Sequence, residues 1–333
     1  MKALVTGGGG FLGGAIVRLL LSKGAAVRVL ARGDYPELKA LGVECVRGSV
    51  ADPAAAAAAC AGRDTVFHVA AKVGMWGPYG DFYRDNVTGT ETLLKAAKAA
   101  GAAKFVFTST PSVVYPAGGS EVEGWDESAP YPAKSESNYA ATKALAERAA
   151  LAANDERFST VALRPHLVWG PGRDHMVSTM ISRGRAGKLR RIGAYNKLID
   201  TTYIDDAAAA HWLAAERLSP GAACAGKAYF ISQGDPRPNW DIVNMILAAA
   251  GAPPVARSVP YPAARAAASV LETAWRLAGA GSEPPLTRFV LRQLTTAHWF
   301  DISAARRDLG YEPAVTIEEG MRRLSDWLRS GGK

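Results

Sequence analysis

The chain has 333 residues, enough for one large α/β domain that carries a smaller lobe. Its formal net charge of +8 favours anionic ligands. The basic residues are scattered apart from a run between Arg183 and Arg191, which is typical of a solvated face, so the charge does not indicate nucleic-acid binding. No apolar run is long enough for a transmembrane segment.

Cysteine usage favours a reduced, cytoplasmic environment. Cys45, Cys60 and Cys224 are odd in number and lack Cys-x-x-Cys spacing, so neither a disulfide framework nor a metal site is expected. The N-terminus enters a predicted strand at once, without the segments of a signal peptide. The Ala-rich stretch 263–278 contains Arg265 and Arg276, which predicts a packed or interfacial helix with membrane-surface contact as a minor alternative.

Short β-branched runs alternate with helical stretches from Lys2 to Arg164, a pattern that predicts a parallel sheet with crossover helices. The predicted strands are Lys2–Thr6, Ala26–Ala31, Glu44–Arg47, Thr65–Val69, Lys104–Thr108 and Thr160–Leu163. The predicted helices are Phe11–Lys23, Tyr35–Leu41, Pro53–Ala61, Thr88–Ala100 and Asn138–Asn154. We therefore expect a doubly wound α/β fold.

Beyond Trp169-Gly-Pro-Gly172 the chain is richer in proline and less regular. A short strand at Ala228–Ser232 and a helix near Trp240–Ala250 predict a smaller C-terminal, substrate-binding lobe. We place the dinucleotide-binding domain at residues 1–170 and this lobe mainly at 171–333. Segments from Tyr203 onward are expected to return in part to the sheet domain.

A glycine-rich turn joins the first predicted strand to the first helix. Gly7, Gly10 and Gly13 have the spacing at which glycines allow a tight turn, close approach to a pyrophosphate, and packing of helix on strand. The helix N-terminus then offers free N–H groups to the phosphates. The motif predicts a Rossmann-type domain in which Phe11 and Leu12 also contact the dinucleotide.

The end of the second strand bears on cofactor choice. Ala31 stands where an acid would bond the ribose 2′-hydroxyl of NAD, and Arg32 follows it, where its planar fork suits the 2′-phosphate of NADP. NADPH is therefore favoured over NADH. The alternative is that Arg32 is a surface arginine and that Asp34 serves as a late ribose acid.

Tyr139 and Lys143 are one helical turn apart on the same face. Tyrosine is a weak acid with a pKa of about 10, so a catalytic tyrosine needs a nearby cation, which Lys143 can supply. Hydroxyl groups follow the strand that ends at Thr108, where ligands of open α/β sheets bind. This combination predicts transfer of a hydride to or from a carbon and of a proton to or from its oxygen.

These features occur together in one known enzyme family. The residues that carry the resemblance are Gly7/Gly10/Gly13, Thr108-Ser109-Thr110, Tyr139/Lys143 and Arg164-Pro165. They resemble an extended short-chain dehydrogenase/reductase over essentially the whole chain. His68-Val-Ala-Ala-Lys72 and Leu163-Arg-Pro-His-Leu-Val-Trp-Gly-Pro171 resemble its 3β-hydroxysteroid dehydrogenase-like branch. Asn196-Lys-Leu-Ile-Asp-Thr-Thr-Tyr-Ile-Asp205 is most similar to the 2-alkyl-3-oxoalkanoate reductases of bacterial long-chain olefin biosynthesis.

The resemblance implies roles for individual residues. Tyr139 would be the general acid in ketone reduction, and Lys143 would bind the ribose hydroxyls and lower the pKa of the phenol. Thr110 would hold the carbonyl oxygen, with Ser109 or Ser112 as alternatives. The remaining implied cofactor contacts are Ser49, which replaces the family's usual aspartate, Val50, Ala70, Ala71 and Pro165, and Asn86 would brace the helix behind the lysine.

A 2-alkyl-3-oxo acid needs a cation for its carboxylate and an apolar trough for its alkyl chains. Lys72 and either Arg173 or His175 are the candidate cations, although each is equally compatible with a surface position. Trp76, on a glycine-flanked loop, is the preferred aromatic contact, whereas Trp125, Trp169 and Trp299 fit either a pocket or the core. His68, His211 and His298 are interpreted as structural.

The resemblance implies a hydrophobic ketone or acid as substrate, a homodimer that pairs through the Thr88–Ala100 and Asn138–Asn154 helices, and association with other olefin-pathway enzymes. Two alternatives stay open. One is an NAD(P)-dependent 3β-hydroxysteroid or sterol dehydrogenase on the same scaffold. The other is a cofactor-sensing protein without turnover, which the presence of both Tyr139 and Lys143 disfavours.

Overall fold

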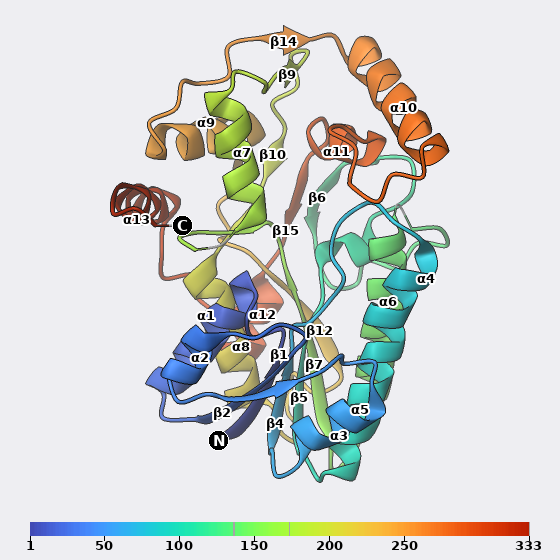
Figure 1. Ribbon diagram of the computed structural model, residues 1–333, viewed down its shortest axis with the longest axis vertical. Helices are drawn as coiled ribbons and strands as arrows, with labels where there is room; N and C mark the ends of the chain where they lie inside the picture. Colours follow the sequence, from blue (N-terminus) through green and yellow to red (C-terminus); the bar gives the residue numbers. More distant parts are fainter. Residues whose placement is uncertain (136, 173, 333) are drawn as a thin grey trace.

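The computed structural model describes residues 1–135, 137–172 and 174–332. A central parallel sheet of seven strands forms the lower part of the molecule in Figure 1. In spatial order its strands are β12 (Lys227–Ile231), β7 (Ser159–Pro165), β5 (Lys104–Thr108), β4 (Thr65–His68), β1 (Lys2–Thr6), β2 (Ala26–Ala31) and β3 (Glu44–Arg47). The strand order reverses between β1 and β4, which is the switch point where Rossmann-type folds bind ligands.

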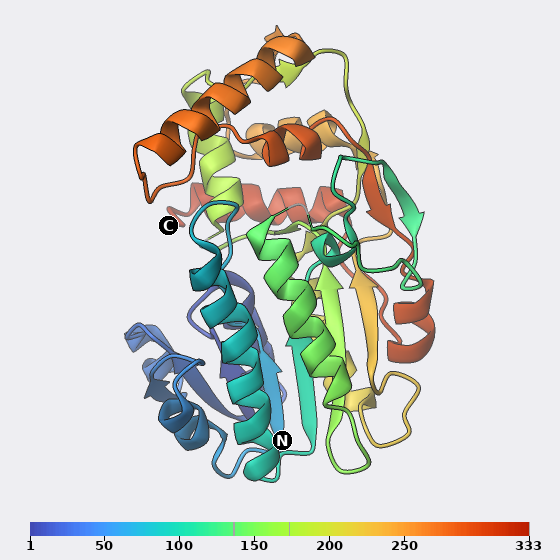
Figure 2. The same cartoon turned by 90° about the vertical axis from the view of Figure 1, so that its right-hand side faces the viewer.

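Helices cover both faces of the sheet. The helices α1 (Phe11–Ser22) and α8 (Ile204–Arg217) lie on one face, and α5 (Gly89–Ala99) and α6 (Asn138–Ala152) on the other (Figures 1 and 2). Because both faces are covered, β1, β4, β5 and β7 are buried along almost their whole length, which explains their continuous apolar sequences. The other helices of this part are α2 (Pro36–Ala40), α3 (Pro53–Cys60), α4 (Tyr79–Phe82), α12 (Ser303–Leu309) and α13 (Ile317–Arg329).

A smaller lobe stands above the carboxyl ends of the strands (Figure 1). Its helices are α7 (His175–Arg185), α9 (Asn239–Ala249), α10 (Tyr261–Leu277) and α11 (Arg288–Gln293). Short strands lie between this lobe and the sheet domain: β13 (Arg237–Pro238), β10 (Leu198–Ile199), β15 (His298–Phe300) and β6 (Val122–Trp125) in one sheet, and β11 (Thr202–Tyr203) with β8 (Val168–Trp169). A further pair, β14 (Ser258–Val259) with β9 (Arg191–Ile192), lies at the far end of the lobe (Figure 1).

The predicted strands are confirmed, four of them to the residue. The strand expected at Thr65–Val69 ends one residue earlier, and that expected at Thr160–Leu163 extends to Ser159–Pro165. The strand expected at Ala228–Ser232 lies in the sheet domain and not in the smaller lobe, in keeping with the expectation that segments from Tyr203 onward return there. This segment forms β12 and pairs in parallel with β7, so that Tyr229, Phe230 and Ile231 are buried at the edge of the central sheet.

A π-helix at Tyr83–Thr88 precedes α5, where the sequence predicted only a regular helix from Thr88. Asn86 lies in this π-helix and donates from Nδ2 to the Lys72 carbonyl at 3.1 Å and to the Thr142 hydroxyl at 3.1 Å. Its Oδ1 accepts from the Lys72 N–H at 2.7 Å. As expected, Asn86 braces α6 beside Lys143, and π-helical turns are often found at functional sites.

A buried ion pair fastens α6 to β7. Glu147 accepts from Arg164 Nη2 at 2.6 Å and from Arg164 Nε at 3.0 Å, and both side chains are buried. Tyr131 donates its hydroxyl to the same carboxylate at 2.6 Å. Since each charge is held by the other, removal of either one leaves an uncompensated charge in the core.

We predict that Glu147→Gln lowers the free energy of unfolding by about 3 kcal/mol or more, because Arg164 would remain buried without its counter-charge. The measurement is urea denaturation of the purified protein. Asp326→Asn is the matched control, since it breaks exposed pairs with Arg322 and Arg329 and should cost about 1 kcal/mol or less. Equal losses in the two variants would contradict this account of the pair.

Candidate active site

The glycine-rich turn after β1 forms a cradle that no larger residue can occupy. Gly7 has φ +70°, and a Cβ there would lie 3.0 Å from the backbone of Ala70. A Cβ on Gly13 would clash with the Gly7 carbonyl. Gly10 is the N-cap of α1 and carries no side chain to bond the first-turn N–H groups. The cradle therefore fits a pyrophosphate, which those N–H groups and the helix dipole favour.

The predicted cofactor residues share the carboxyl edge of the sheet. Arg32 follows β2, Ser49 and Val50 follow β3, and Ala70 and Ala71 follow β4. Pro165 ends β7, and Phe11 and Leu12 open α1. The Phe11 ring lies against Gly172, where a Cβ would be 3.1 Å from it. The fold thus brings these residues to one edge, although the Ser49 hydroxyl is used by the Ala51 N–H at 3.2 Å.

The Arg32 side chain is 74% exposed, and its Nη1 lies 3.4 Å from Asp85 Oδ2. Arg47 donates from Nε to the Arg32 carbonyl at 3.2 Å, which places a second guanidinium beside the end of β2. Asp34 is instead paired with Lys39 at 2.7 Å. Arg32, with its long 3.4 Å contact to Asp85, and Arg47, whose Nε bonds a backbone carbonyl, are the guanidinium groups of this corner that fit a phosphate, whereas Asp34 is paired with Lys39.

Tyr35 was not identified from the sequence as a site residue. A Cβ on Gly9 would clash with the Tyr35 ring, and one on Gly33 would lie 3.0 Å from it. The ring therefore packs against both the glycine-rich turn and the turn after β2. An aromatic residue two positions after Gly33, in the turn that follows the second predicted strand, is the sequence signal that could have indicated this contact.

Lys143 is buried in α6, and its Nζ donates to the Thr108 carbonyl at 2.6 Å. The ammonium also lies 4.0 Å from the centroid of the Phe107 ring. Burial lowers the pKa of Lys143 to about 7, and the Glu147 carboxylate opposes that shift. The lysine therefore gains or loses its proton near neutral pH.

Burial raises the pKa of Tyr139 to about 12, and the Thr110 hydroxyl bonded to it acts in the opposite direction. In the chain without its dinucleotide, desolvation outweighs the groups that lower this pKa, and the effect expected of Lys143 stays a prediction for the cofactor-bound state. Tyr139 is therefore a neutral phenol near neutral pH. This is the form that can donate a proton.

Among the hydroxyl residues Thr108, Ser109 and Thr110, the side chains of Ser109 and Thr110 lie in different surroundings. Thr110 is half-buried, bonds Ser112 Oγ at 3.1 Å, and accepts from the Ser112 N–H at 3.3 Å. The Ser109 Oγ is buried without a hydrogen-bond partner among the described residues. The Thr110 hydroxyl bonded to Tyr139 is the group of the triplet that the structure places at the phenol.

A cavity of about 850 Å³ lies beside the N-terminus of α6, and Ser137 and Asn138 form part of its wall. Its volume is within the range typical of small-molecule sites. The lining includes the indoles of Trp76 and Trp275. It also includes the two acids Asp81 and Glu272 and five cationic side chains, Lys72, Lys134, Arg276, Arg288 and Arg292.

Some of the predicted substrate residues line this cavity and others do not. Lys72 and Trp76 line it, whereas His175 is exposed at the start of α7 and is not part of its wall. Ser112 is buried beside Thr110 rather than in the wall. Arg173 lies outside the described residues. Trp169 is a core residue whose Nε1 donates to Thr201 Oγ1 at 2.9 Å.

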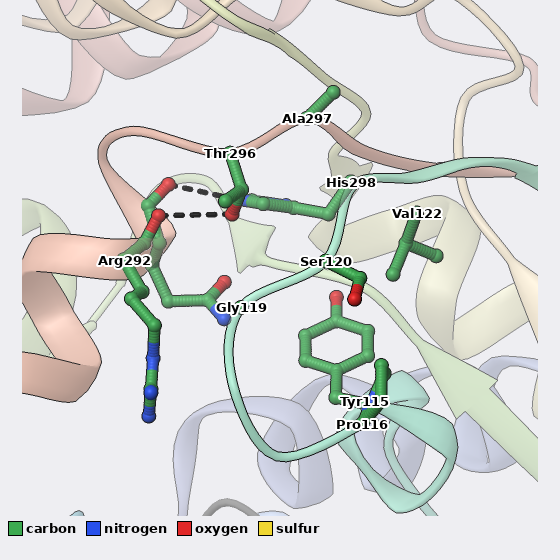
Figure 3. Close-up of a pocket in the computed structure, with 10 residues that line it drawn as sticks. Tyr115, Pro116, Gly119, Ser120, Val122, Arg292, Thr296, Ala297 and His298 are labelled. Carbon is green, nitrogen blue, oxygen red and sulfur yellow. Dashed lines mark hydrogen bonds between the residues drawn. The ribbon is translucent and has the colours of Figure 1, made fainter.

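Figure 3 shows a second cavity of about 10 Å³, with Tyr115 and Pro116 on one side and Arg292 and Thr296 on the other. It has room for about one water molecule. Next to it the buried His166 Nε2 lies 3.2 Å from both the Tyr115 hydroxyl and His298 Nδ1. This small cavity is part of a hydrogen-bonded interior, which agrees with the structural role expected for His298.

The chain matches the 3-beta hydroxysteroid dehydrogenase/isomerase family over residues 4–260. It belongs to this family. A 2-alkyl-3-oxoalkanoate reductase of Stenotrophomonas maltophilia (strain K279a) is 50% identical over 97% of this chain and 98% of the relative. The enzyme of the same name from Shewanella oneidensis is 48% identical over 97% of this chain and 85% of the relative.

A 3-beta-hydroxysteroid dehydrogenase of Mycolicibacterium neoaurum is 33% identical over 96% of this chain and 89% of the relative. Among solved structures, UDP-glucuronic acid 4-epimerase of Bacillus cereus in complex with NAD has a TM-score of 0.76 at 22% identity, with 100% of both chains covered. At this identity, the similarity to the epimerase shows the fold alone. As a member of the 3-beta hydroxysteroid dehydrogenase/isomerase family, the protein is an NAD(P)-dependent oxidoreductase.

We predict that Lys143 makes stability depend on pH. Its pKa falls from 10.5 to about 7 on folding, so the unfolded chain binds more protons between these values. The stability due to this group is fully present above about pH 10.5 and is lost as the pH falls to about 7, with a slope of at most ~1.4 kcal/mol per pH unit. Urea denaturation of wild type and Lys143→Met across this range measures the difference. A difference that does not change with pH would contradict the burial of the ammonium.

Proposed function

We propose that this protein reduces the 3-keto group of a long-chain 2-alkyl-3-oxoalkanoate to a hydroxyl group, with NADPH as hydride donor. The observation that carries the proposal is the large cavity at the N-terminus of α6, where five cations outnumber two acids and two indoles supply apolar surface. Such a lining suits an acid with alkyl chains. The two relatives of about 50% identity bear the name of this activity.

In this mechanism the bound dinucleotide supplies the hydride that forms the new C–H bond. Tyr139 donates its phenolic proton to the ketone oxygen as the C=O π bond breaks, and Thr110 holds that oxygen by a hydrogen bond. Lys143 binds the ribose hydroxyls and afterwards helps the phenol to regain a proton from solvent. The raised pKa of Tyr139 supports this direction, because the phenol remains protonated until the product oxygen develops negative charge.

The cation that holds the substrate carboxylate is Lys72 in this proposal. Its Nζ lies 4.0 Å from Asp81 Oδ2 and 5.3 Å from the centroid of the Phe82 ring. Arg288, by contrast, is held by Glu272 through a 2.6 Å bond to its Nε. Lys72 is therefore the more loosely paired of the two and is free to exchange its partner for a carboxylate.

Several relatives of 33–34% identity are named for steroid or sterol substrates, and a 3β-hydroxysteroid dehydrogenase is the second candidate. A 3β-hydroxysteroid without a carboxyl group would leave the five cations of the cavity unused, whereas the sterol carboxylates for which two of these relatives are named would use them. We further propose a cytoplasmic homodimer that pairs through α5 and α6 and associates with other olefin-pathway enzymes. The exposed Leu145 on α6 supports that pairing face.

We predict that the protein reduces 2-alkyl-3-oxo acids with NADPH and that Tyr139→Phe lowers kcat by about 10²–10⁴-fold while cofactor binding is retained. NADPH oxidation at a panel of 2-alkyl-3-oxo acids and 3-ketosteroids measures the activity, and protein fluorescence measures binding. Tyr311→Phe, a buried tyrosine that bonds the Ser232 carbonyl, is the control and should keep its activity. Turnover of the steroids alone would overturn the substrate assignment, and an active Tyr139→Phe would overturn the proton donor.

We predict that Arg32→Ala weakens NADPH binding at least tenfold and leaves NADH binding nearly unchanged, because only NADPH carries a phosphate for the guanidinium to bind. Arg329→Ala is the matched control, since the Arg329 side chain is 71% exposed on α13 and the Arg32 side chain is 74% exposed. Fluorescence titration of both dinucleotides measures the effect. Equal affinity of the wild type for the two would remove the case for NADPH.

A further inference from the structure

Exposed apolar side chains are concentrated beside the large cavity. Among the described residues, the three most exposed large apolar side chains are Leu277 at 83%, Val73 at 70% and Val270 at 68%. Leu277 and Val270 belong to α10, and Val73 belongs to the loop that follows β4. These are the two segments that supply Lys72, Trp76, Trp275 and Arg276 to the cavity wall. Large exposed apolar side chains in one region mark an interaction site more often than scattered ones do.

Helix α10 has two apolar faces, only one of which packs against the protein. Ala264, Ala268 and Glu272 are buried. The opposite face is exposed and carries apolar residues at helical spacing: Ala263, Ala266, Ala267, Val270, Ala274 and Leu277. A helix face toward water is normally polar, so this stripe is suited to contact with another apolar phase.

Two basic residues lie on one side of α10, between its buried face and the exposed stripe. Arg265 and Arg276 are both exposed, and the one acid of the helix, Glu272, is buried and bonded to Arg288. A helix with an apolar face and exposed arginines is typical of helices that lie in the interface of an anionic bilayer. In both views α10 lies at the outer edge of the smaller lobe, away from the amino-terminal strands of the sheet (Figures 1 and 2).

We propose that α10 and the Val73 loop form a docking surface for an anionic lipid bilayer, from which the substrate enters the cavity. Val270 and Leu277 insert among the acyl chains, and Arg265 and Arg276 pair with anionic headgroups. Lys72 of the cavity wall then receives the substrate carboxylate without its passage through bulk water. The identity of that acid rests on the proposed function, but the docking itself does not.

The charge on α10 favours a bilayer over a second copy of the chain. No helix of residues 1–135, 137–172 and 174–332 is long and apolar enough to cross a membrane. A symmetric contact with a second copy would set α10 against itself, and the helix exposes no acid to pair with Arg265 and Arg276 of the other copy.

The test is co-sedimentation of the full chain with phosphatidylcholine vesicles that contain about a quarter phosphatidylglycerol, at about 0.1 M salt, without substrate. We expect the wild type to sediment with these vesicles and to bind pure phosphatidylcholine vesicles about tenfold or more weakly. Leu277→Glu should weaken binding to the anionic vesicles about tenfold, because it removes an inserted side chain and adds a repelled charge.

Leu41→Glu is the matched control, since Leu41 is 51% exposed beside α2 in the sheet domain and undergoes the same change of residue and charge. It should bind within about twofold of the wild type, because one added charge far from the surface is screened. Failure of the wild type to bind, or equal losses in the two variants, would overturn the proposal. So would a dimer that Leu277→Glu converts to a monomer in sedimentation equilibrium, because α10 would then be covered by a second copy.

The vesicle-binding test and the test of the proposed function can fail independently of each other. Vesicle binding is measured in the absence of substrate, and Leu277→Glu leaves Tyr139, Thr110 and Lys143 unchanged. Activity toward a short, water-soluble 2-alkyl-3-oxo acid should therefore be the same in wild type and Leu277→Glu. Absence of that activity with intact vesicle binding would contradict the proposed substrate alone.

Discussion

The active site depends on one buried ammonium group. Lys143 lies within α6, where a charge is expensive unless it is compensated, and its Nζ has the Thr108 carbonyl at 2.6 Å and the Phe107 ring at 4.0 Å as partners. Glu147, one turn further along, favours the charged form and is itself held by Arg164. Opposite charges thus alternate from Lys143 through Glu147 to Arg164, which fixes β7 next to its last residue, Pro165.

The sequence predicts most of the sheet because its signal is local. Runs such as Lys2–Thr6 and Lys104–Thr108 are continuous and apolar, as strands covered on both faces must be. The place of Lys227–Ile231 in the central sheet could not be predicted from its own residues, because it depends on pairing with β7, which is distant in the sequence. The π-helix at Tyr83–Thr88 is likewise set by bonds from Asn86 to Lys72 and Thr142, which lie far from it in the sequence.

For the active site, the i, i+4 spacing placed Tyr139 and Lys143 on one face of a helix, and the glycine spacing predicted the cradle after β1. Sequence spacing carries no information about desolvation, which raises the pKa of Tyr139 to about 12 in the chain without its dinucleotide. Tyr35 was also missed. Its contact with Gly9 joins two turns that follow different strands, and only the packing of those strands brings them together.

Burial shifts the pKa values of Tyr139 and Lys143 in opposite directions. It raises the pKa of Tyr139 and lowers that of Lys143, so both shifts favour the neutral form of each group. A neutral phenol is the form needed to protonate a ketone oxygen, whereas the reverse reaction needs a phenolate that the same burial penalises. An anionic dinucleotide would favour the ammonium form of Lys143, because an opposite charge nearby stabilises it. Desolvation therefore sets the resting protonation for reduction, and binding of the anionic cofactor would restore the charge on the lysine.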